Sequence, residues 1–222
     1  MAVAFVGSMK VARMLGVDTL KTTWYNIHRP PQNLKNAENV DMVMNFSDCC
    51  EKYGGRYRTD KLIRMGELHK VAPGLYSDKA EWSDVEVMLA RYPRAVVTLQ
   101  SAYYYYDLSD SIPDVFHLAT DRDAAKICDG RVAQHFIPNG TIGIGVVSGK
   151  FLDEEVSRIF DKERLLIETA RNKTKLPYDL YKEVVESFRR IKDTLYPAKL
   201  TDYLEAFPKK ESILRTIESE VF

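Results

Sequence analysis

The glycine-rich stretch 140–150 is the first place to look for phosphate chemistry, and its spacing does not fit. A P-loop needs four residues between its first glycine and a Gly-Lys pair, which Ser or Thr then follows. Gly145 stands one residue too close to Gly149, and Phe151 follows the lysine. A dinucleotide-binding fingerprint fails as well, because Ser148 takes the place of its third glycine. We therefore assign these glycines to a strand and a hairpin.

A nucleotidyltransferase signature is half present near the start of the chain. Gly7-Ser8 followed by Asp18 matches its first part, but Leu20 stands where the second carboxylate is required. Paired carboxylates are needed to hold two metal ions, so we reject a two-metal site here.

The remaining titratable residues form no recognisable catalytic pattern. The four histidines show no HExxH motif and no close cysteine partner; they are His28, His69, His117 and His135. We therefore predict no catalytic residue, no metal ligand and no cofactor. The alternative is an enzyme acting on nucleic acid or nucleotides, with a site assembled from distant residues. Its candidate carboxylates are Asp121, Asp123, Asp153, Glu154 and Glu155. Solvated loop charge is the simpler interpretation of these five.

Composition limits the classes of partner. The formal net charge is zero, so no global field attracts nucleic acid and any binding must come from a local patch. A hydrophobic content of 45% is normal for a globular protein. Cys49, Cys50 and Cys128 are an odd number without metal-binding spacing, which favours a reduced, cytoplasmic protein. No stretch reaches the length of a membrane span, so we predict no membrane partner.

The chemistry with the most support is nucleic-acid binding by the stretch 46–77. It contains two predicted short helices around Gly54-Gly55, followed by a hairpin. Ser47 is the expected N-cap of the first helix, and the second runs over about 56–65. Ala72-Pro73-Gly74 is a turn between apolar runs. Helix, tight turn, helix and hairpin is the layout of a winged helix-turn-helix.

The second of these helices has an apolar side and a mostly basic side. At about 100° per residue, Leu62, Ile63 and Met65 share the apolar side. Between residues 52 and 64 the chain has five basic residues and one acid, Asp60. Such a helix can pack on its own domain and present Arg and Lys to a DNA groove. The alternative is an ordinary solvated helix, since surface helices are commonly charged.

The whole pattern predicts an α+β fold, with an N-terminal winged helix-turn-helix and then a mixed α/β domain with a helical C-terminus. The expected domains are an N-terminal helical arm at 1–40, the winged helix-turn-helix at 41–80 and the C-terminal domain at 81–222. In the last of these, the expected strands are 95–97, 115–120, 131–137, 141–147 and 156–160. The expected helices are 83–91, 98–106, 161–171, 180–195, 197–206 and 211–221.

Three helix starts carry capping signals. Ser83-x-x-Glu86 is a capping box, and Thr98 and Asp161 are expected N-caps. The helix after Thr98 contains four consecutive tyrosines, 103–106, which could stack on bases or pack between helix and sheet. We favour packing, because four consecutive residues point all round a helix.

In combination, these features resemble the AbiEi family, the antitoxins of bacterial abortive-infection (type IV toxin–antitoxin) systems. Residues 65–76 look like the family's wing, in which glycine, leucine, valine, glycine and tyrosine recur in order. Residues 92–113 are similar to its strand, capped helix and LSD-x-x-P turn. Residues 142–168 resemble its Gly-Ile strand followed by a helix that opens on an acidic residue. The three matches keep the family's order and spacing, and together they span most of 46–222.

The resemblance implies a non-enzymatic repressor that binds inverted repeats of double-stranded operator DNA in its own promoter. It also implies a partner gene for a nucleotidyltransferase-like toxin, with which no stable complex is expected. For the chain itself we expect a monomer or weak dimer. The residues it places at the DNA are Arg56, Tyr57, Arg58, Lys61, Arg64, His69 and Lys70. Two departures stand out. Ala72-Pro73 makes the wing tip neutral, and 1–40 does not match the usual first helix.

A third class of function is an interaction module whose winged helix contacts protein, because fold alone does not decide function. Apolar residues near the C-terminus could mediate dimerisation or close the core, and we favour the core. They are Leu195, Leu200, Tyr203, Leu204 and Phe207.

Overall fold

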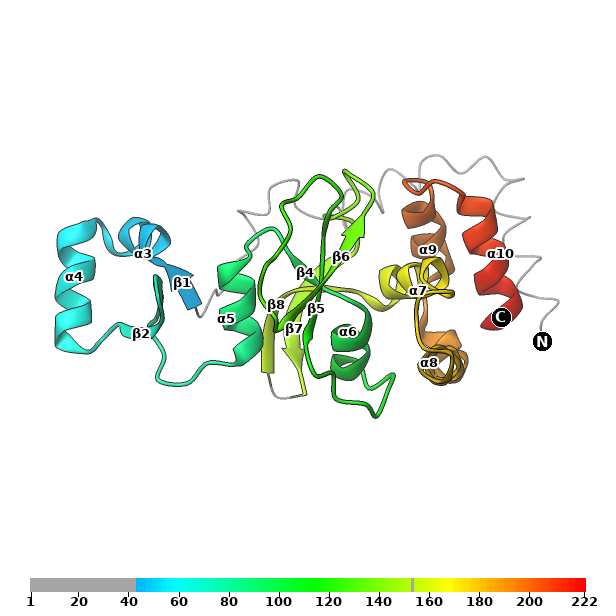
Figure 1. Cartoon of the computed structure of the whole chain (residues 1–222), viewed down its shortest axis with the longest axis horizontal. Helices are drawn as coiled ribbons and strands as arrows, with labels where there is room; N and C mark the ends of the chain where they lie inside the picture. Colours follow the sequence, from blue (N-terminus) through cyan, green and yellow to red (C-terminus); the bar gives the residue numbers. More distant parts are fainter. Residues whose placement is uncertain (1–42, 153) are drawn as a thin grey trace. The chain divides into compact units, whose positions relative to one another are not determined.

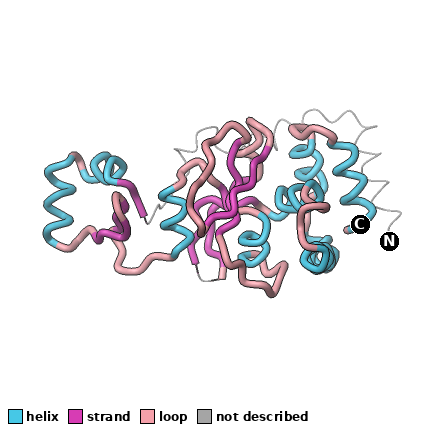
Figure 2. Tube along the Cα trace, viewed as in Figure 1, coloured by secondary structure: helices cyan, strands magenta, loops and turns pink. Residues whose placement is uncertain are grey.

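This computed structural model describes residues 43–152 and 154–222. They form two sheets with flanking helices (Figure 1; Figure 2). Strands and helices follow one another without a regular βαβ repeat, which confirms the predicted mixed α+β class. The predicted N-terminal arm, 1–40, lies outside the described residues. So does Asp153, one of the five candidate carboxylates.

The first sheet is small, antiparallel and packed on both faces. Its order is β1 (Val43–Asn45), β3 (Leu75–Ser77) and β2 (His69–Ala72). Between β1 and β2 the chain forms α3 (Phe46–Tyr53) and α4 (Arg56–Met65). Met44 and Tyr76 are cross-strand partners and pack with residues of α3 and α4. On the other face, Val43 and Leu75 pack with Val87 of α5 (Asp84–Arg91). Apolar packing therefore continues across the expected boundary at residue 80.

Helix α3 is capped by Asn45, and the prediction of Ser47 was wrong. Asn45 is extended, with φ −76° and ψ 166°, and its side-chain oxygen accepts from the backbone N–H of Asp48 at 2.9 Å. Its amide nitrogen also donates to the Asp48 carboxylate at 2.7 Å. The chain turns from β1 directly into the helix, so Phe46 already has helical geometry and Ser47 comes too late to cap.

The second sheet has five strands around the short central strand β4 (Val96–Val97). Its order is β6 (Val132–Ile137), β5 (Phe116–Asp121), β4, β8 (Glu154–Phe160) and β7 (Val146–Phe151). β4 pairs antiparallel with β5 and parallel with β8, while β5 and β6 are parallel and β7 and β8 antiparallel. Val97, Leu118 and Ile159 are partners in register and share one face.

The helices after α5 are α6 (Leu99–Tyr105), α7 (Lys162–Arg171), α8 (Tyr178–Ile191), a 3₁₀ turn (Lys192–Thr194), α9 (Pro197–Leu204) and α10 (Lys210–Glu220). The Ser83–Glu86 capping box and the Asp161 N-cap are both confirmed. Thr98 stands at the N-cap of α6 as predicted. However, its hydroxyl makes no capping bond and is buried without a partner among the described residues.

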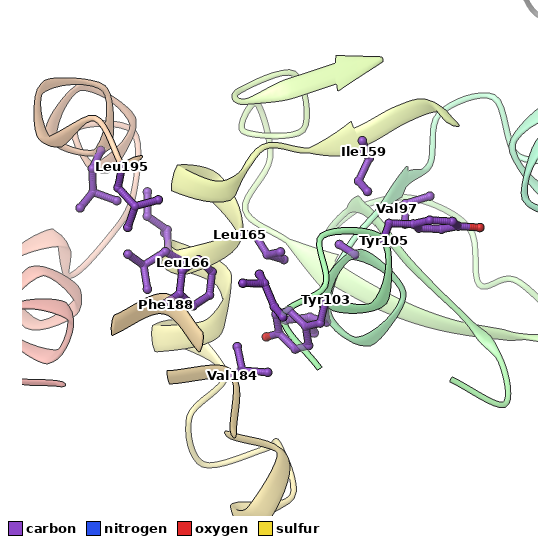
Figure 3. Packing of buried hydrophobic residues seen from close by; sticks show 14 of the residues in the cluster. Val97, Tyr103, Tyr105, Ile159, Leu165, Leu166, Val184, Phe188 and Leu195 are labelled. Carbon is purple, nitrogen blue, oxygen red and sulfur yellow. The ribbon is translucent and has the colours of Figure 1, made fainter. Parts of the chain in front are cut away.

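The larger core lies on the face of Val97 and Ile159 and joins the sheet to the helices. Figure 3 shows Tyr103 of α6, Leu165 of α7 and Phe188 of α8 in this cluster. The apolar residues near the C-terminus belong to it as well, which confirms that they close the core. The tyrosine run is also packed, because Tyr103 and Tyr105 are buried and their neighbours half-buried. The Tyr103 hydroxyl lies 2.9 Å from that of Thr169.

A fully buried arginine, Arg164 of α7, contacts several separate segments of the C-terminal half of the chain. Its guanidinium donates to the Glu168 carboxylate at 2.8 and 3.1 Å and to the backbone carbonyl of Thr141 at 2.9 Å. The guanidinium also lies over the rings of Phe160 and Phe207, 4.5 and 4.4 Å from their centroids. A buried charge of this kind is tolerable only when it is paired and hydrogen-bonded.

The loop whose carbonyls accept hydrogen bonds from Arg164 lies where the sequence predicted a strand. The pattern of 141–147 predicted a strand, but residues 138–145 form turns and β7 begins at Val146. The Thr141 hydroxyl donates to the Pro138 carbonyl at 2.7 Å, and the Thr141 carbonyl accepts from both Arg164 and the backbone N–H of Ile144. Gly145 has φ +72°, and a Cβ there would lie 2.6 Å from the Arg164 Cβ. The alternating pattern was overridden because this segment wraps the buried guanidinium.

Removing the negative partner of Arg164 should destabilise the protein strongly. Glu168→Gln leaves the buried guanidinium without the carboxylate that it pairs with, and we expect a loss of roughly 3–5 kcal/mol in the free energy of unfolding. Urea unfolding followed by circular dichroism measures it. Glu218→Gln, at an exposed glutamate of α10, is the matched control and should change stability by less than about 0.5 kcal/mol. Equal effects of the two substitutions would show that the ion pair is not a major stabilising contact.

Candidate nucleic-acid interface

The position of helix α4 is set by the packing of its inner side and by the turn at the two glycines before it. Gly54 and Gly55 have φ +78° and +111°, and both lie in the region that favours glycine, so the chain can reverse in two residues. Thr59 is fully buried, and its hydroxyl donates to the Gly55 carbonyl at 3.1 Å. Leu62 and Ile63 pack on the cluster of Met44, Cys49 and Leu68. These contacts determine which side of α4 faces outward.

The outward side of α4 carries most of the predicted DNA-binding residues together. Its exposed side chains include Arg56, Tyr57, Arg58, Lys61 and Arg64. Arg56 and Asp60 form a loose pair at 3.8 Å, and both are well exposed, so the pair contributes little. Lys61 and Arg64 make no ion pair with any residue of 43–152 or 154–222. The structure thus presents a cationic helix face that its own described residues do not neutralise.

The charges in the first turn of α4 run against its own helix dipole, whereas Arg64 in the last turn is favourably placed. The helix has Gly55 at its N-cap with no side-chain hydrogen bond, no acid in its first turn, and arginines at its first and third positions. Positive charge at a helix N-terminus is unfavourable by a few tenths to about 1 kcal/mol per group. By contrast, α5 and α7 start with a side-chain cap and an acid. Such local conflicts tend to occur at functional sites, where a ligand compensates them.

The hairpin does not bring His69 and Lys70 to the same face. Lys70 pairs with Tyr76, which packs beside α4, whereas His69 pairs with the buried Ser77 on the face toward α5. Successive residues of a strand point to opposite faces, so only Lys70 shares the side of α4. The turn itself is Pro73-Gly74, with a bulge between Lys70 and Ala72.

Lys52, the fifth basic residue of this region, forms an ion pair with a residue outside α4. Its ammonium lies 2.7 Å from the Asp78 carboxylate, which also accepts from the Tyr53 hydroxyl at 3.0 Å. This cluster joins the end of α3 to the residue after β3. The cationic patch therefore belongs to α4 and not to the whole stretch 52–64.

Met65 does not lie on the apolar side of α4, and the prediction that placed it there was wrong. Its exposed fraction is 57%, while Leu62 and Ile63 are half-buried against the cluster. The packed side is centred on Thr59 and Ile63, and Met65 comes about 140° away from this centre at about 100° per residue. Tyr57, with an exposed fraction of 84%, lies on the same outward side.

The candidate carboxylates of the enzyme alternative are spread over two strands and a loop. Asp121 ends β5, Asp123 is exposed in the turn that follows, and Glu154 and Glu155 begin β8. The Glu154 carboxylate accepts from the Tyr105 hydroxyl at 2.9 Å. Nowhere in 43–152 or 154–222 do three or more His, Cys, Asp or Glu side chains gather as a metal site would require.

The structure brings together two histidines that sequence reasoning left scattered. His117 of β5 and His135 of β6 stack with ring centroids 5.0 Å apart, and His117 Nδ1 lies 2.9 Å from His135 Nε2. Burial and the neighbouring His135 lower the pKa of His117 to about 4. Only the parallel register of β5 and β6 creates this pair, because 18 residues separate the two histidines in the chain.

None of the described helices is both long and apolar enough to cross a membrane. Among the cysteines, Cys49 is buried in the α3–α4 cluster, Cys50 is half-buried and Cys128 is exposed, and none of them forms a disulfide.

Comparison with known proteins adds little to these observations. No protein-family model and no curated protein matches the chain. A crystal structure of the RV2827C protein from Mycobacterium tuberculosis matches with a TM-score of 0.48 and 16% sequence identity, covering 81% of this chain and 72% of that one. A similarity of this size supports no conclusion about function.

The histidine pair should make the protein less stable in mild acid. The pKa of His117 is lower in the folded chain than the ordinary 6.5, so the unfolded chain binds more protons between these values. The contribution of His117 to the free energy of unfolding is fully present above about pH 6.5. It falls as the pH drops toward 4, by up to about 3 kcal/mol. Protonation of both rings is disfavoured because two N–H donors would then face each other. The charged groups near the pair act on His135 in opposite directions, since Glu168 raises its pKa and Lys175 lowers it.

The measurement compares urea unfolding of the wild type and of His117→Asn across this pH range. Carboxylates titrate in both proteins, so only the difference between the two pH profiles reports His117. The variant should lose less stability in acid. Profiles that run parallel would contradict the assignment.

Proposed function

We propose that residues 43–77 form a winged helix-turn-helix that binds double-stranded operator DNA through α4. The observation that carries this proposal is the outward side of α4, where Arg56, Arg58, Lys61 and Arg64 are exposed beside a single acid. A protein of zero net charge needs such a local patch, because no global field attracts the DNA. Helices of this kind enter the major groove and read base edges with Arg and Lys.

The geometry around α4 supports this role in three ways. Helix α3 and the two-glycine turn precede α4, as the first helix and turn of a helix-turn-helix would. The β2–β3 hairpin follows it, as a wing would, and places Lys70 on the side of α4. The charges that oppose the helix dipole would be compensated by phosphates. With a neutral Pro73-Gly74 tip, the wing would leave most of the binding to the helix.

The biological role proposed for this binding follows from the resemblance to the AbiEi antitoxins. The protein would repress its own operon in the cytoplasm by binding promoter repeats, as a monomer or weak dimer. A nucleotidyltransferase-like toxin would be its functional partner without a stable complex. This part of the proposal rests on the order of the sequence motifs in 65–76, 92–113 and 142–168.

The test is a fluorescence-anisotropy titration of the full chain on labelled DNA from its own upstream region, with scrambled DNA as competitor. Lys61→Ala or Arg64→Ala should each weaken binding by about 1–3 kcal/mol if the side chain contacts a base. A side chain that contacts a phosphate should instead reduce the salt slope of log Kd by about 1.

Lys182→Ala is the matched control, because Lys182 is an exposed lysine of α8 outside the proposed interface. It should leave both affinity and salt slope unchanged. Wild-type binding that does not distinguish upstream from scrambled DNA would overturn the proposal and leave the helix pair available for a protein contact. Equal losses from Lys61→Ala and Lys182→Ala would remove α4 from the interface.

A further inference from the structure

Two large apolar side chains stand on the cationic side of α4 where a surface helix would ordinarily carry polar ones. Tyr57 has the highest exposed fraction among the large hydrophobic residues of the described chain, 84%, and Met65 has 57%. Single exposed hydrophobic residues are common and need no explanation. These two differ because they share one helix face with Lys61 and Arg64.

The spacing places the four residues in one strip. Tyr57, Lys61 and Met65 follow one another at intervals of four, and Arg64 is seven residues after Tyr57, so all four lie within about 100° of the helix circumference. The helix cannot rotate to bury Tyr57 and Met65. Its opposite side, with Thr59, Leu62 and Ile63, packs against α3 and the first sheet. The strip is therefore fixed, with two cationic groups, Lys61 and Arg64, between two apolar ones.

This arrangement matches the chemistry of the base-pair edges in the major groove. In the major groove, Lys and Arg bind guanine O6 and N7, and the thymine C5-methyl is the apolar group that a side chain can contact. From Tyr57 to Met65 the helix rises about 12 Å, which spans roughly three to four base pairs. The ring of Tyr57 and the flexible thioether of Met65 are suited to cover methyl groups at the two ends of this span.

We propose that Tyr57 and Met65 read thymine methyl groups, so that the recognised half-site has thymines on either side of the bases contacted by Lys61 and Arg64. This inference rests on the proposed function, since it requires α4 to lie in the major groove. It assigns sequence selectivity to two side chains that carry no charge. It also predicts that their loss changes base preference without changing the salt dependence that phosphate contacts produce.

The experiment replaces thymines by deoxyuridines, one position at a time, in the upstream DNA fragment that the full chain protects from cleavage. Deoxyuridine keeps the base pair and removes only the methyl group. For the wild type, we expect at least two positions at which this replacement weakens binding about fourfold, the value for one buried methyl-sized group. Tyr57→Ala and Met65→Ala should each bind the thymine DNA more weakly and lose sensitivity at one of these positions.

Ile112→Ala and Tyr178→Ala are the matched controls, because these residues are 71% and 76% exposed and lie outside α4. Both controls should keep the wild-type sensitivity at every position. Specific, salt-dependent binding that ignores the missing methyl groups would overturn this inference and leave the repressor proposal standing. Variants of Tyr57 and Met65 that weaken binding but stay sensitive to deoxyuridine would also overturn it. Failure to bind the upstream DNA specifically would refute both proposals.

Discussion

The burial of the Arg164 guanidinium is the constraint on which most of the C-terminal half depends. Removing a charge from water costs several kcal/mol, so the chain must surround it with partners. Glu168 supplies the counter-charge and is itself held by Arg171 at 2.7 Å. The 138–145 loop supplies carbonyls, and the guanidinium lies over the rings of Phe160 and Phe207. One side chain thus joins the end of β8, α7 and the segment between α9 and α10.

A second polar cluster at the start of α7 extends this arrangement. Asp161 caps the helix through Arg164 N–H at 2.8 Å, and its other oxygen accepts from the Tyr203 hydroxyl and pairs with Lys199, both at 2.9 Å. Glu163 also pairs with Lys199 and accepts from the backbone of Tyr196. Helix α9 is therefore attached to α7 by polar contacts as well as by the apolar core. Every charge in this cluster has a described partner, which is the pattern of a structural site.

The region around α4 follows the opposite principle. Among the described residues, its packed side consists of Thr59, Leu62 and Ile63. Its N-terminus lacks a side-chain cap, and the arginines of its first turn oppose the helix dipole. Sites that bind a ligand commonly give up local stability in this way, because the ligand supplies the missing interactions. Arg164 is fully paired, whereas Arg64 forms no ion pair with a residue of 43–152 or 154–222. In a chain of zero net charge, this contrast directs a functional proposal to α4.

Local signals determined much of this protein from its sequence alone. The Gly54-Gly55 turn, the capping box at Ser83 and the Asp161 cap appeared where neighbouring residues predict them, since such features depend on contacts within a few residues. Only the tertiary structure decided the rest. The 138–145 loop replaced a strand because a distant arginine needed carbonyl acceptors, and His117 met His135 because two strands pair in parallel. Met65 faces outward because packing against β1 and β3 sets the rotation of α4, and no local pattern contains that information.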